Sequence, residues 1–285
     1  MNRFKLWFRI VRPQTLFASL VPVLVGLFSV KYSGGGIETG HPFLTGTLTA
    51  VCALSLQILS NLINDYYDFL RGTDKAGRAG FKRALAEGEV TKGQMLDAIF
   101  ITLAIVIVTG LYLVLSGGIP ILLIGCSAIL FAWLYTATSH SLSYLGIADI
   151  FVFLYYGVLA SAGTAYLQTH SFVPASFYAG AVCGLISMCV LMINNLRDVE
   201  DDRMAGKRTL PVRFGVKAAE AIMLVEILLM PVFAYLAFGL SPAMLIVVAA
   251  ACLYVAVLRA ERAQYNKCLL CTGLMNVLYL VLCLI

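Results

Sequence analysis

The chain has 285 residues, of which 61% are hydrophobic and only 12% are charged, about half the charged share of an average soluble domain. The mean hydropathy is +0.91, and the 99 residues from Ala98 to Leu196 contain no Lys, Arg or Glu and a single Asp, Asp149. These values exclude a disordered chain, a collagen and a secreted disulfide scaffold, and they argue against a soluble globular protein. They indicate a polytopic membrane protein.

Breaks at Gly, Pro, Ser, His or clustered charges divide the chain into nine apolar segments, each close to the roughly 20 residues that a spanning helix needs. We therefore expect an all-α fold, a polytopic membrane bundle of nine transmembrane helices forming one integral membrane domain over residues 1–285. The predicted spans are 14–32, 43–67, 94–116, 119–139, 145–168, 173–196, 216–238, 241–259 and 266–285.

The basic residues predict the orientation of these spans. Of the 20 Lys and Arg residues, 19 fall on the N-terminal tail and on the loops after spans two, six and eight, and only Lys31 falls on the other side. Because cytoplasmic loops are enriched in Lys and Arg, we expect a cytoplasmic N-terminus. The net charge of +5 then reflects topology and requires no nucleic-acid partner. The first span has no convincing small-residue cleavage site, so we expect it to be retained.

Acidic residues gather at the ends of predicted spans two and six, within residues 61–78 and 194–208. The two segments form an imperfect repeat: an Asn precedes an Asp by four residues, another Asp follows, and then Ala-Gly and a basic residue. Residues four apart share one face of a helix, so Asn64 lies beneath Asp68, and Asn194 lies beneath Asp198. Each segment therefore presents a ridge of carboxylates near a helix end.

These ridges predict a metal site. Several carboxylates at the mouth of a bundle repel one another unless a cation neutralises them. Hard oxygen ligands favour Mg²⁺, which completes its shell with water and substrate phosphates, and nearby bases suit the remaining phosphate oxygens. The alternative is a pair of ordinary cytoplasmic loops with solvated charges, and the repetition of the motif weighs against it. The basic residues beside the acids are Lys75, Arg78, Arg197, Lys207 and Arg208.

At these two segments the chain resembles the UbiA superfamily of intramembrane aromatic prenyltransferases, whose Asn-x3-Asp-rich motifs lie on the second and sixth of nine helices. The motif residues are most similar to those of the branch that prenylates 1,4-dihydroxy-2-naphthoate in menaquinone synthesis. In the 4-hydroxybenzoate branch the third Asp follows the position of Asp68 by four residues, whereas Asp74 follows it here by six. The resemblance covers nearly the whole chain and implies helices around a central cavity, with cytoplasmic Asp-rich loops, in a bacterial inner membrane.

The resemblance implies transfer of a polyprenyl group from polyprenyl diphosphate to 1,4-dihydroxy-2-naphthoate, with loss of carbon dioxide and diphosphate, giving demethylmenaquinone. Metal and basic residues would stabilise the departing diphosphate, and a dry aromatic cavity would keep water from the allylic cation. By the same resemblance, Asp68, Asp74, Asp198 and Asp202 would hold two Mg²⁺ ions. The side chains implied to support the metal and the diphosphate are Asn64, Arg71, Lys75, Arg78, Asn194, Arg197 and Lys207.

Two further acids are assigned to catalysis, each with two open roles. Asp65 is either a metal ligand or an acceptor of hydrogen bonds behind the metal. Asp149 stands at the start of span five with no basic neighbour in sequence. It either faces the cavity and binds or deprotonates a substrate hydroxyl, or it is an interfacial residue at the positive end of a helix dipole.

Other functions remain open at this point. A different acceptor, such as 4-hydroxybenzoate, a chlorophyll precursor or haem, is compatible with the motifs. A cation transporter is the alternative that is not an enzyme, although transporters place ion sites near the midplane on broken helices, whereas these motifs lie at helix ends. The sequence lacks the Asp-Gly-x2-Ala-Arg motif of CDP-alcohol phosphotransferases. Prenyl chain length and oligomeric state are not determined by the sequence.

Overall fold

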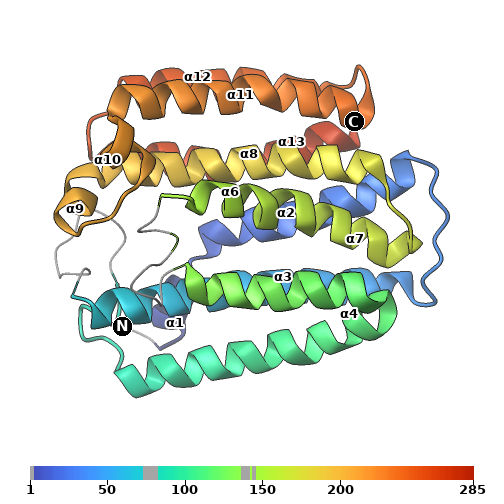
Figure 1. Ribbon diagram of the computed structural model, residues 1–285, viewed down its shortest axis with the longest axis horizontal. Coiled ribbons are helices and arrows are strands. Elements are labelled where there is room, and N and C mark those ends of the chain that lie inside the picture. Colours follow the sequence, from blue (N-terminus) through green and yellow to red (C-terminus); the bar gives the residue numbers. More distant parts are fainter. Residues whose placement is uncertain (1–2, 73–82, 136–141, 143–145) are drawn as a thin grey trace.

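The apolar sequence forms long helices that lie roughly side by side along one axis (Figure 1). The computed structural model describes residues 3–72, 83–135, 142 and 146–285. Within these residues every regular element is a helix and none is a strand, so the prediction of an all-α fold is confirmed. The helices are α1 Arg3–Val11, α2 Pro13–Tyr32, α3 Pro42–Leu70, α4 Lys92–Leu134, α6 Ala148–Phe153, η1 Leu154–Val158, α7 Leu159–Thr169, α8 Pro174–Arg197, α9 Val199–Met204, α10 Leu210–Phe214, α11 Val216–Phe238, η2 Pro242–Leu245, α12 Ile246–Leu258 and α13 Tyr265–Leu284.

Seven helical segments of the described residues are long and apolar enough to cross a membrane. One of them, α4, has 43 residues, about twice the length that a bilayer needs. Its backbone leaves the helical region at Gly118 (φ 68°, ψ −152°), and Figure 1 shows the chain turning back there. This break falls between the third and fourth predicted spans. Pro242–Leu258 is apolar but shorter, so the count of nine spans stays a prediction. Residues 136–139 of the fourth predicted span lie outside the described residues.

The fifth predicted span is one continuous helical rod made of α6, the π-helical turn η1 and α7. It packs closely on α8 through glycines. A Cβ atom on Gly157 would lie 2.5 Å from the carbonyl oxygen of Gly180 and 2.6 Å from the backbone of Gly184. Small residues allow such close approach between helices in membranes, where apolar burial gives little drive for association. A π turn widens the helix locally and often accompanies a functional site.

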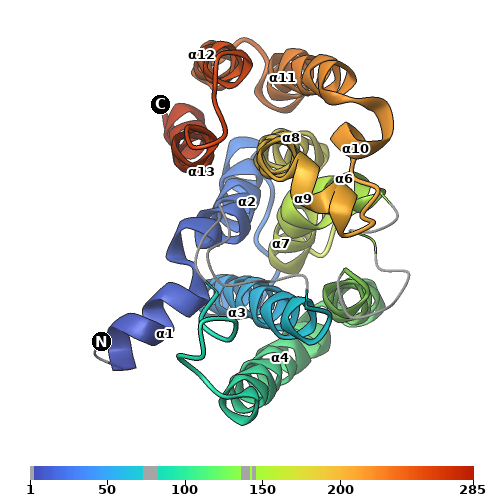
Figure 2. The same ribbon diagram turned by 90° about the vertical axis from the view of Figure 1, so that its left-hand side faces the viewer.

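The two largest hydrophobic clusters of the described residues form most of the interior. The larger joins α8 with α11, α12 and α13, and the second joins α3 with α1 and the first limb of α4. Seen along the bundle, these two groups lie on opposite sides, with α2 and α7 between them (Figure 2). Both α3 and α8 end at the end of the bundle that carries α9 and α10 (Figure 1). The described parts of the two acidic segments are therefore brought to one end of the protein.

Candidate active site

A cavity of about 910 Å³ lies between the two groups of helices and extends to the end where α3 and α8 finish. Residues from α2, α3, both limbs of α4, α6 to α8 and α13 line it. Most of its wall is apolar, and the acids gather where α3 and α8 end. Seven of the predicted side chains meet there: Asn64, Asp68, Asn194, Arg197, Asp198, Asp202 and Lys207.

The end of α3 is fixed by an amide side chain that sits one turn before the motif. Asn61 donates hydrogen bonds to Thr15 Oγ1 (3.1 Å) and to the carbonyl oxygen of Val11 (3.4 Å), which joins α3 to the start of α2. Beyond it, Asp68 is buried and faces the cavity. The Oδ1 atom of Asn64 is also buried in the cavity wall, with no hydrogen-bond partner among the described residues. The helical spacing of four thus places Asn64 and Asp68 on the same wall, as predicted.

Asp65 occupies a different position from its neighbours. It is buried and does not line the cavity, and both Arg12 and Arg83 pair with its Oδ1 atom, Arg83 at 2.5 Å. Both arginines do line the cavity. Of its two open roles, this arrangement supports that of an acceptor behind the site, because the carboxylate orients two guanidinium groups and is itself neutralised by them.

The end of α8 places a second set of charges opposite the first. Arg197 ends the helix and donates from Nε and Nη2 to both oxygens of Asp198, at 2.8 and 2.7 Å. Its Nη1 atom donates to Asn266 Oδ1 at 2.8 Å, which ties the pair to α13. One turn later, Lys207 Nζ lies 3.5 Å from Asp202. All of these side chains line the cavity.

Other predicted residues lie outside the cavity wall. Arg71 and Arg208 are described, and neither side chain lines the cavity. Asp201, which the helical spacing turns off the ridge, pairs with Arg262 on the exposed side of α9. The roles predicted for Arg71 and Arg208 at the diphosphate therefore stay predictions. Asp74, Lys75 and Arg78 were also predicted here and lie outside the described residues.

Asp149 lines the same cavity from the first turn of α6. It is buried, and its Oδ1 atom has no hydrogen-bond partner among the residues described. Both roles left open for Asp149 place it at the start of a helix, but a residue at the membrane interface would be exposed. The position in the cavity wall supports the role in binding a substrate.

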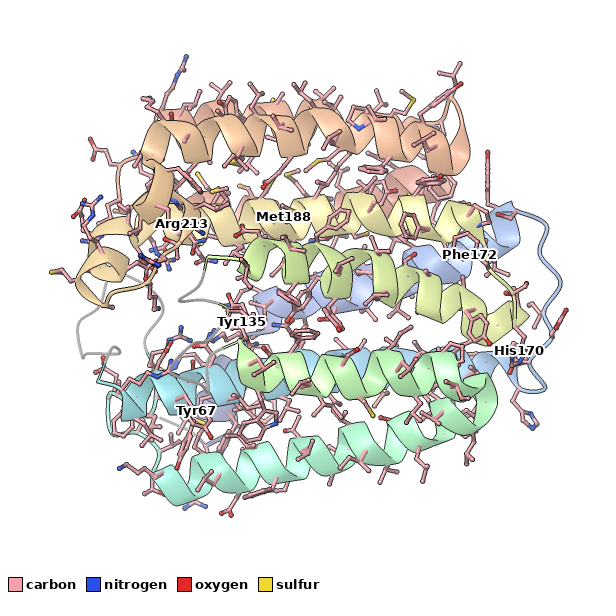
Figure 3. The ribbon with its side chains drawn as sticks, in the orientation of Figure 1. Tyr67, Tyr135, His170, Phe172, Met188 and Arg213 are labelled. Atoms are coloured by element: carbon pink, nitrogen blue, oxygen red, sulfur yellow. The ribbon has the colours of Figure 1, made fainter. Side chains whose placement is uncertain are left out.

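Tyr135 lines the cavity (Figure 3), and Asp149, Asp68 and Asp202 are near it. Its phenol hydroxyl is available as a hydrogen-bond donor in the cavity.

Aromatic rings form part of the apolar wall next to this polar end. Phe131 on the second limb of α4 lies 4.3 Å from Phe151 and 5.2 Å from Tyr155, measured between ring centroids, and all three line the cavity. The π turn η1 contains Tyr155 and Tyr156. Ring faces stabilise nearby cations, and packed rings exclude water.

The carboxylate oxygens in the cavity suit a Mg²⁺ ion that is bound partly by water and substrate, and they do not suit a closed site in which every metal ligand comes from the protein. Within the described residues, no three His, Cys, Asp or Glu side chains converge on one point that would hold an ion. Mg²⁺ is usually bound through one or two carboxylates and completes its shell with water and substrate phosphates. Asp68 on one wall and Asp198 and Asp202 on the other fit that pattern.

Sequence reasoning missed several residues that face this cavity. Arg12 and Arg83 were used only among the basic residues that predict the orientation of the spans. No sequence spacing distinguishes Arg83 from the other basic residues of its loop. Asn276 carried a usable signal, because a polar residue in the middle of an apolar span is costly unless it faces an interior.

Several known proteins are similar to this chain over most of its length. The model of the UbiA prenyltransferase family matches residues 19–278. A 1,4-dihydroxy-2-naphthoate octaprenyltransferase from Escherichia coli (strain K12) is 36% identical over 221 residues, which cover 75% of this chain and 70% of the relative. One of the same name from Haemophilus influenzae is 32% identical, covering 85% of this chain and 79% of the relative.

A solved structure agrees with the fold. A UbiA homologue from Archaeoglobus fulgidus, bound to GPP and Mg²⁺, superposes with a TM-score of 0.70 at 18% identity, covering 98% of each chain. At that identity the likeness shows a shared fold alone. The family match over most of the chain, together with the bacterial relatives, shows that the chain belongs to the UbiA prenyltransferase family.

Proposed function

We propose that this prenyltransferase transfers a polyprenyl group from polyprenyl diphosphate to 1,4-dihydroxy-2-naphthoate in a bacterial inner membrane. The observation that carries the proposal is that the Asn- and Asp-bearing ends of α3 and α8 line the polar end of one otherwise apolar cavity. The names of the bacterial relatives support the choice of acceptor. The distribution of Lys and Arg supports a cytoplasmic N-terminus and a cytoplasmic polar end.

The polar end has the groups that a prenyl diphosphate requires. Asp68, Asp198 and Asp202 would hold Mg²⁺, joined by Asp74, and bound Mg²⁺ would neutralise the charge that develops on the leaving diphosphate. The homologue bound to GPP and Mg²⁺ supports this use of the metal. Asn64 and Asn194 would orient the acids and the diphosphate from the same walls.

Cationic side chains of this chain would bind the remaining phosphate oxygens. Arg12, Arg83 and Lys207 all reach the cavity, and each is held by an acid that fixes its position: Asp65 for the two arginines and Asp202 for the lysine. Preorganised cations stabilise a developing anion without rearranging during the reaction. Their effect is greatest in a site that excludes water.

In the proposed reaction one bond of the donor and one bond of the acceptor break, and a new bond joins the two substrates. The allylic C–O bond breaks, and its electron pair leaves with the diphosphate. The ring carbon that bears the carboxylate then forms a bond to the allylic carbon. The carboxylate leaves as carbon dioxide, and the electrons of its C–C bond restore the aromatic ring. Asp149 would bind or deprotonate a ring hydroxyl, and Phe131, Phe151 and Tyr155 would keep water away from the cation.

The proposal is tested with the purified protein in lipid nanodiscs. Mg²⁺, a polyprenyl diphosphate and either the naphthoate or 4-hydroxybenzoate are supplied, and the product is identified by mass. With the naphthoate we expect a prenylated product whose mass is lower, by one carbon dioxide, than that of the acceptor carrying the prenyl group and its carboxyl group. Product from 4-hydroxybenzoate alone would show that the chain uses a different acceptor. The absence of product with any acceptor would refute the proposal that the chain is an enzyme. Mg²⁺-dependent release of diphosphate separates this enzyme from a cation transporter.

A further inference from the structure

Two polar side chains in the membrane-embedded part of the cavity have no role in the diphosphate site. Ser187 on α8 and Asn276 on α13 both line the cavity and are 5% and 0% exposed. The hydroxyl of Ser187 and both amide atoms of Asn276 lack a hydrogen-bond partner among the described residues. Burying an amide or a hydroxyl without a partner is costly, so a ligand that satisfies these groups would bind favourably.

The two side chains lie at a similar depth. The neighbouring helices α8 and α13 run in opposite directions, and Arg197 and Asn266 are in contact near the polar end. Ser187 precedes Arg197 by ten residues, and Asn276 follows Asn266 by ten. At about 1.5 Å per residue, both therefore lie about 15 Å along their helices from that contact.

Asp149 reaches the same depth from α6. The carbonyl oxygen of Phe153 lies 2.6 Å from where a Cβ atom on Gly184 would be, so these two residues are level. Since α6 and α8 also run in opposite directions, Asp149, one turn before Phe153, is level with the turn of α8 that contains Ser187. Three unpartnered cavity groups, Asp149 Oδ1 among them, thus occur at one level on three helices.

This level is separated from the diphosphate site by a distance that suits an aromatic substrate. Asn194 of the acidic motif follows Ser187 by seven residues, or about 10 Å of helix. The prenyl tail has no polar atoms, so it offers no partner to these groups. A bicyclic acceptor that reaches from the allylic carbon toward Ser187 can form hydrogen bonds with these groups, because its ring carries hydroxyl groups.

We propose that Ser187 and Asn276, together with Asp149, form the subsite that binds the ring oxygens of the aromatic acceptor. This inference rests on the proposed prenyl transfer to a hydroxylated aromatic acid. The Asn276 amide both donates and accepts, the Ser187 hydroxyl does the same, and Asp149 accepts from a ring hydroxyl. A site built to bind hydroxyl groups rejects an analogue that lacks them, so these residues are assigned to acceptor specificity.

The inference is tested with Asn276→Leu and Ser187→Ala in the full-length protein in nanodiscs, measuring KM for the naphthoate and for polyprenyl diphosphate separately. We expect Asn276→Leu to raise the acceptor KM about tenfold, the loss of roughly one hydrogen bond, while the diphosphate KM stays within about twofold. Ser187→Ala is expected to move the acceptor KM in the same direction by less.

Ser161→Ala is the matched control. Ser161 is also a fully buried serine whose hydroxyl lacks a partner among the residues described, but it does not line the cavity. Its variant should leave both KM values unchanged.

The outcomes separate the two proposals. An active wild type with an unchanged acceptor KM in both variants, or with a rise in the diphosphate KM alone, overturns the subsite and leaves the proposed function standing. A wild type that prenylates no aromatic acceptor overturns both. Thermal unfolding checks folding, and because Asn276 loses no partner in the Leu variant, its midpoint should not fall. If that variant fails to fold, the acceptor KM of Ser187→Ala decides.

Discussion

The buried ion pair at the end of α8 leads to a sharp prediction about stability. Arg197 and Asp198 are each about 5% exposed and share two hydrogen bonds, and Arg197 Nη1 is also bonded to Asn266. Replacement of Arg197 by Met keeps much of the apolar stem and removes the charge. Asp198 then becomes a buried carboxylate without its bidentate partner.

The magnitude follows from that burial. Breaking a buried pair by removing one partner costs about 3–5 kcal/mol, because the remaining charge is left desolvated. In a domain of this size we expect the unfolding midpoint to fall by about 10 °C. The double variant Arg197→Met with Asp198→Asn should regain most of the loss, because neither charge of the pair remains. Mg²⁺ with a prenyl diphosphate analogue should also restore part of the single variant's midpoint, since bound metal would neutralise Asp198.

The assay is thermal unfolding in nanodiscs, followed by intrinsic fluorescence, without Mg²⁺ and then with it. Arg203→Met is the control, because Arg203 pairs with Glu200 at 3.0 Å while both side chains are more than half exposed. Such a surface pair contributes about 0–1 kcal/mol. Equal midpoints for Arg197→Met and Arg203→Met, or a double variant as unstable as the single one, would refute the reasoning.

Two further predictions concern activity and packing. Asp68→Ala should abolish turnover without unfolding the protein, whereas Asp201→Ala, which alters an acid outside the cavity, should retain most of the rate; equal losses in a product assay would contradict the assignment. Gly184→Ala should lower the unfolding midpoint markedly, because its Cβ would lie 2.6 Å from the carbonyl oxygen of Phe153; an unchanged midpoint would argue against the close helix packing.

Much of this arrangement was predictable because membrane sequence carries simple constraints. The apolar segments predicted at 173–196 and 216–238 match α8 and α11 within one residue at each end. Gly118 is the point where α4 turns back, and the predicted break between spans three and four fell on it. These agreements arise because a lipid-facing helix must be long, apolar and bounded by polar or helix-breaking residues.

The site was predicted where local spacing determines it and missed where tertiary contacts do. Asn64 and Asp68 share a cavity wall because they are four residues apart on one helix. Asp65 has the same sequence environment, yet its partners come from Arg12 and Arg83, which are remote in sequence. No periodicity distinguishes an acid that faces a cavity from one that orients the cations around it.

The pairing of acids with bases at the polar end has a consequence for how the substrate binds. Asp198 is paired with Arg197, Asp202 with Lys207, and Asp65 with two arginines, so these carboxylates are balanced by cations of the chain itself. Mg²⁺ alone would add positive charge next to those bases, and diphosphate alone would add negative charge next to the acids. Bound together they nearly cancel, so we predict that each raises the affinity for the other.

Calorimetry tests this coupling. Titration of the protein with Mg²⁺ should show weak binding that tightens by at least about tenfold in the presence of a non-reactive prenyl diphosphonate, and the reverse titration should show the same factor, as linkage requires. Asp202→Asn removes the carboxylate charge that pairs with Lys207 and so takes one negative charge from the metal site, so it should weaken Mg²⁺ binding and lower the coupling factor. Tight Mg²⁺ binding without the diphosphonate would show that the acids converge on a preformed metal site, and the balance of charge proposed for the polar end would then be wrong.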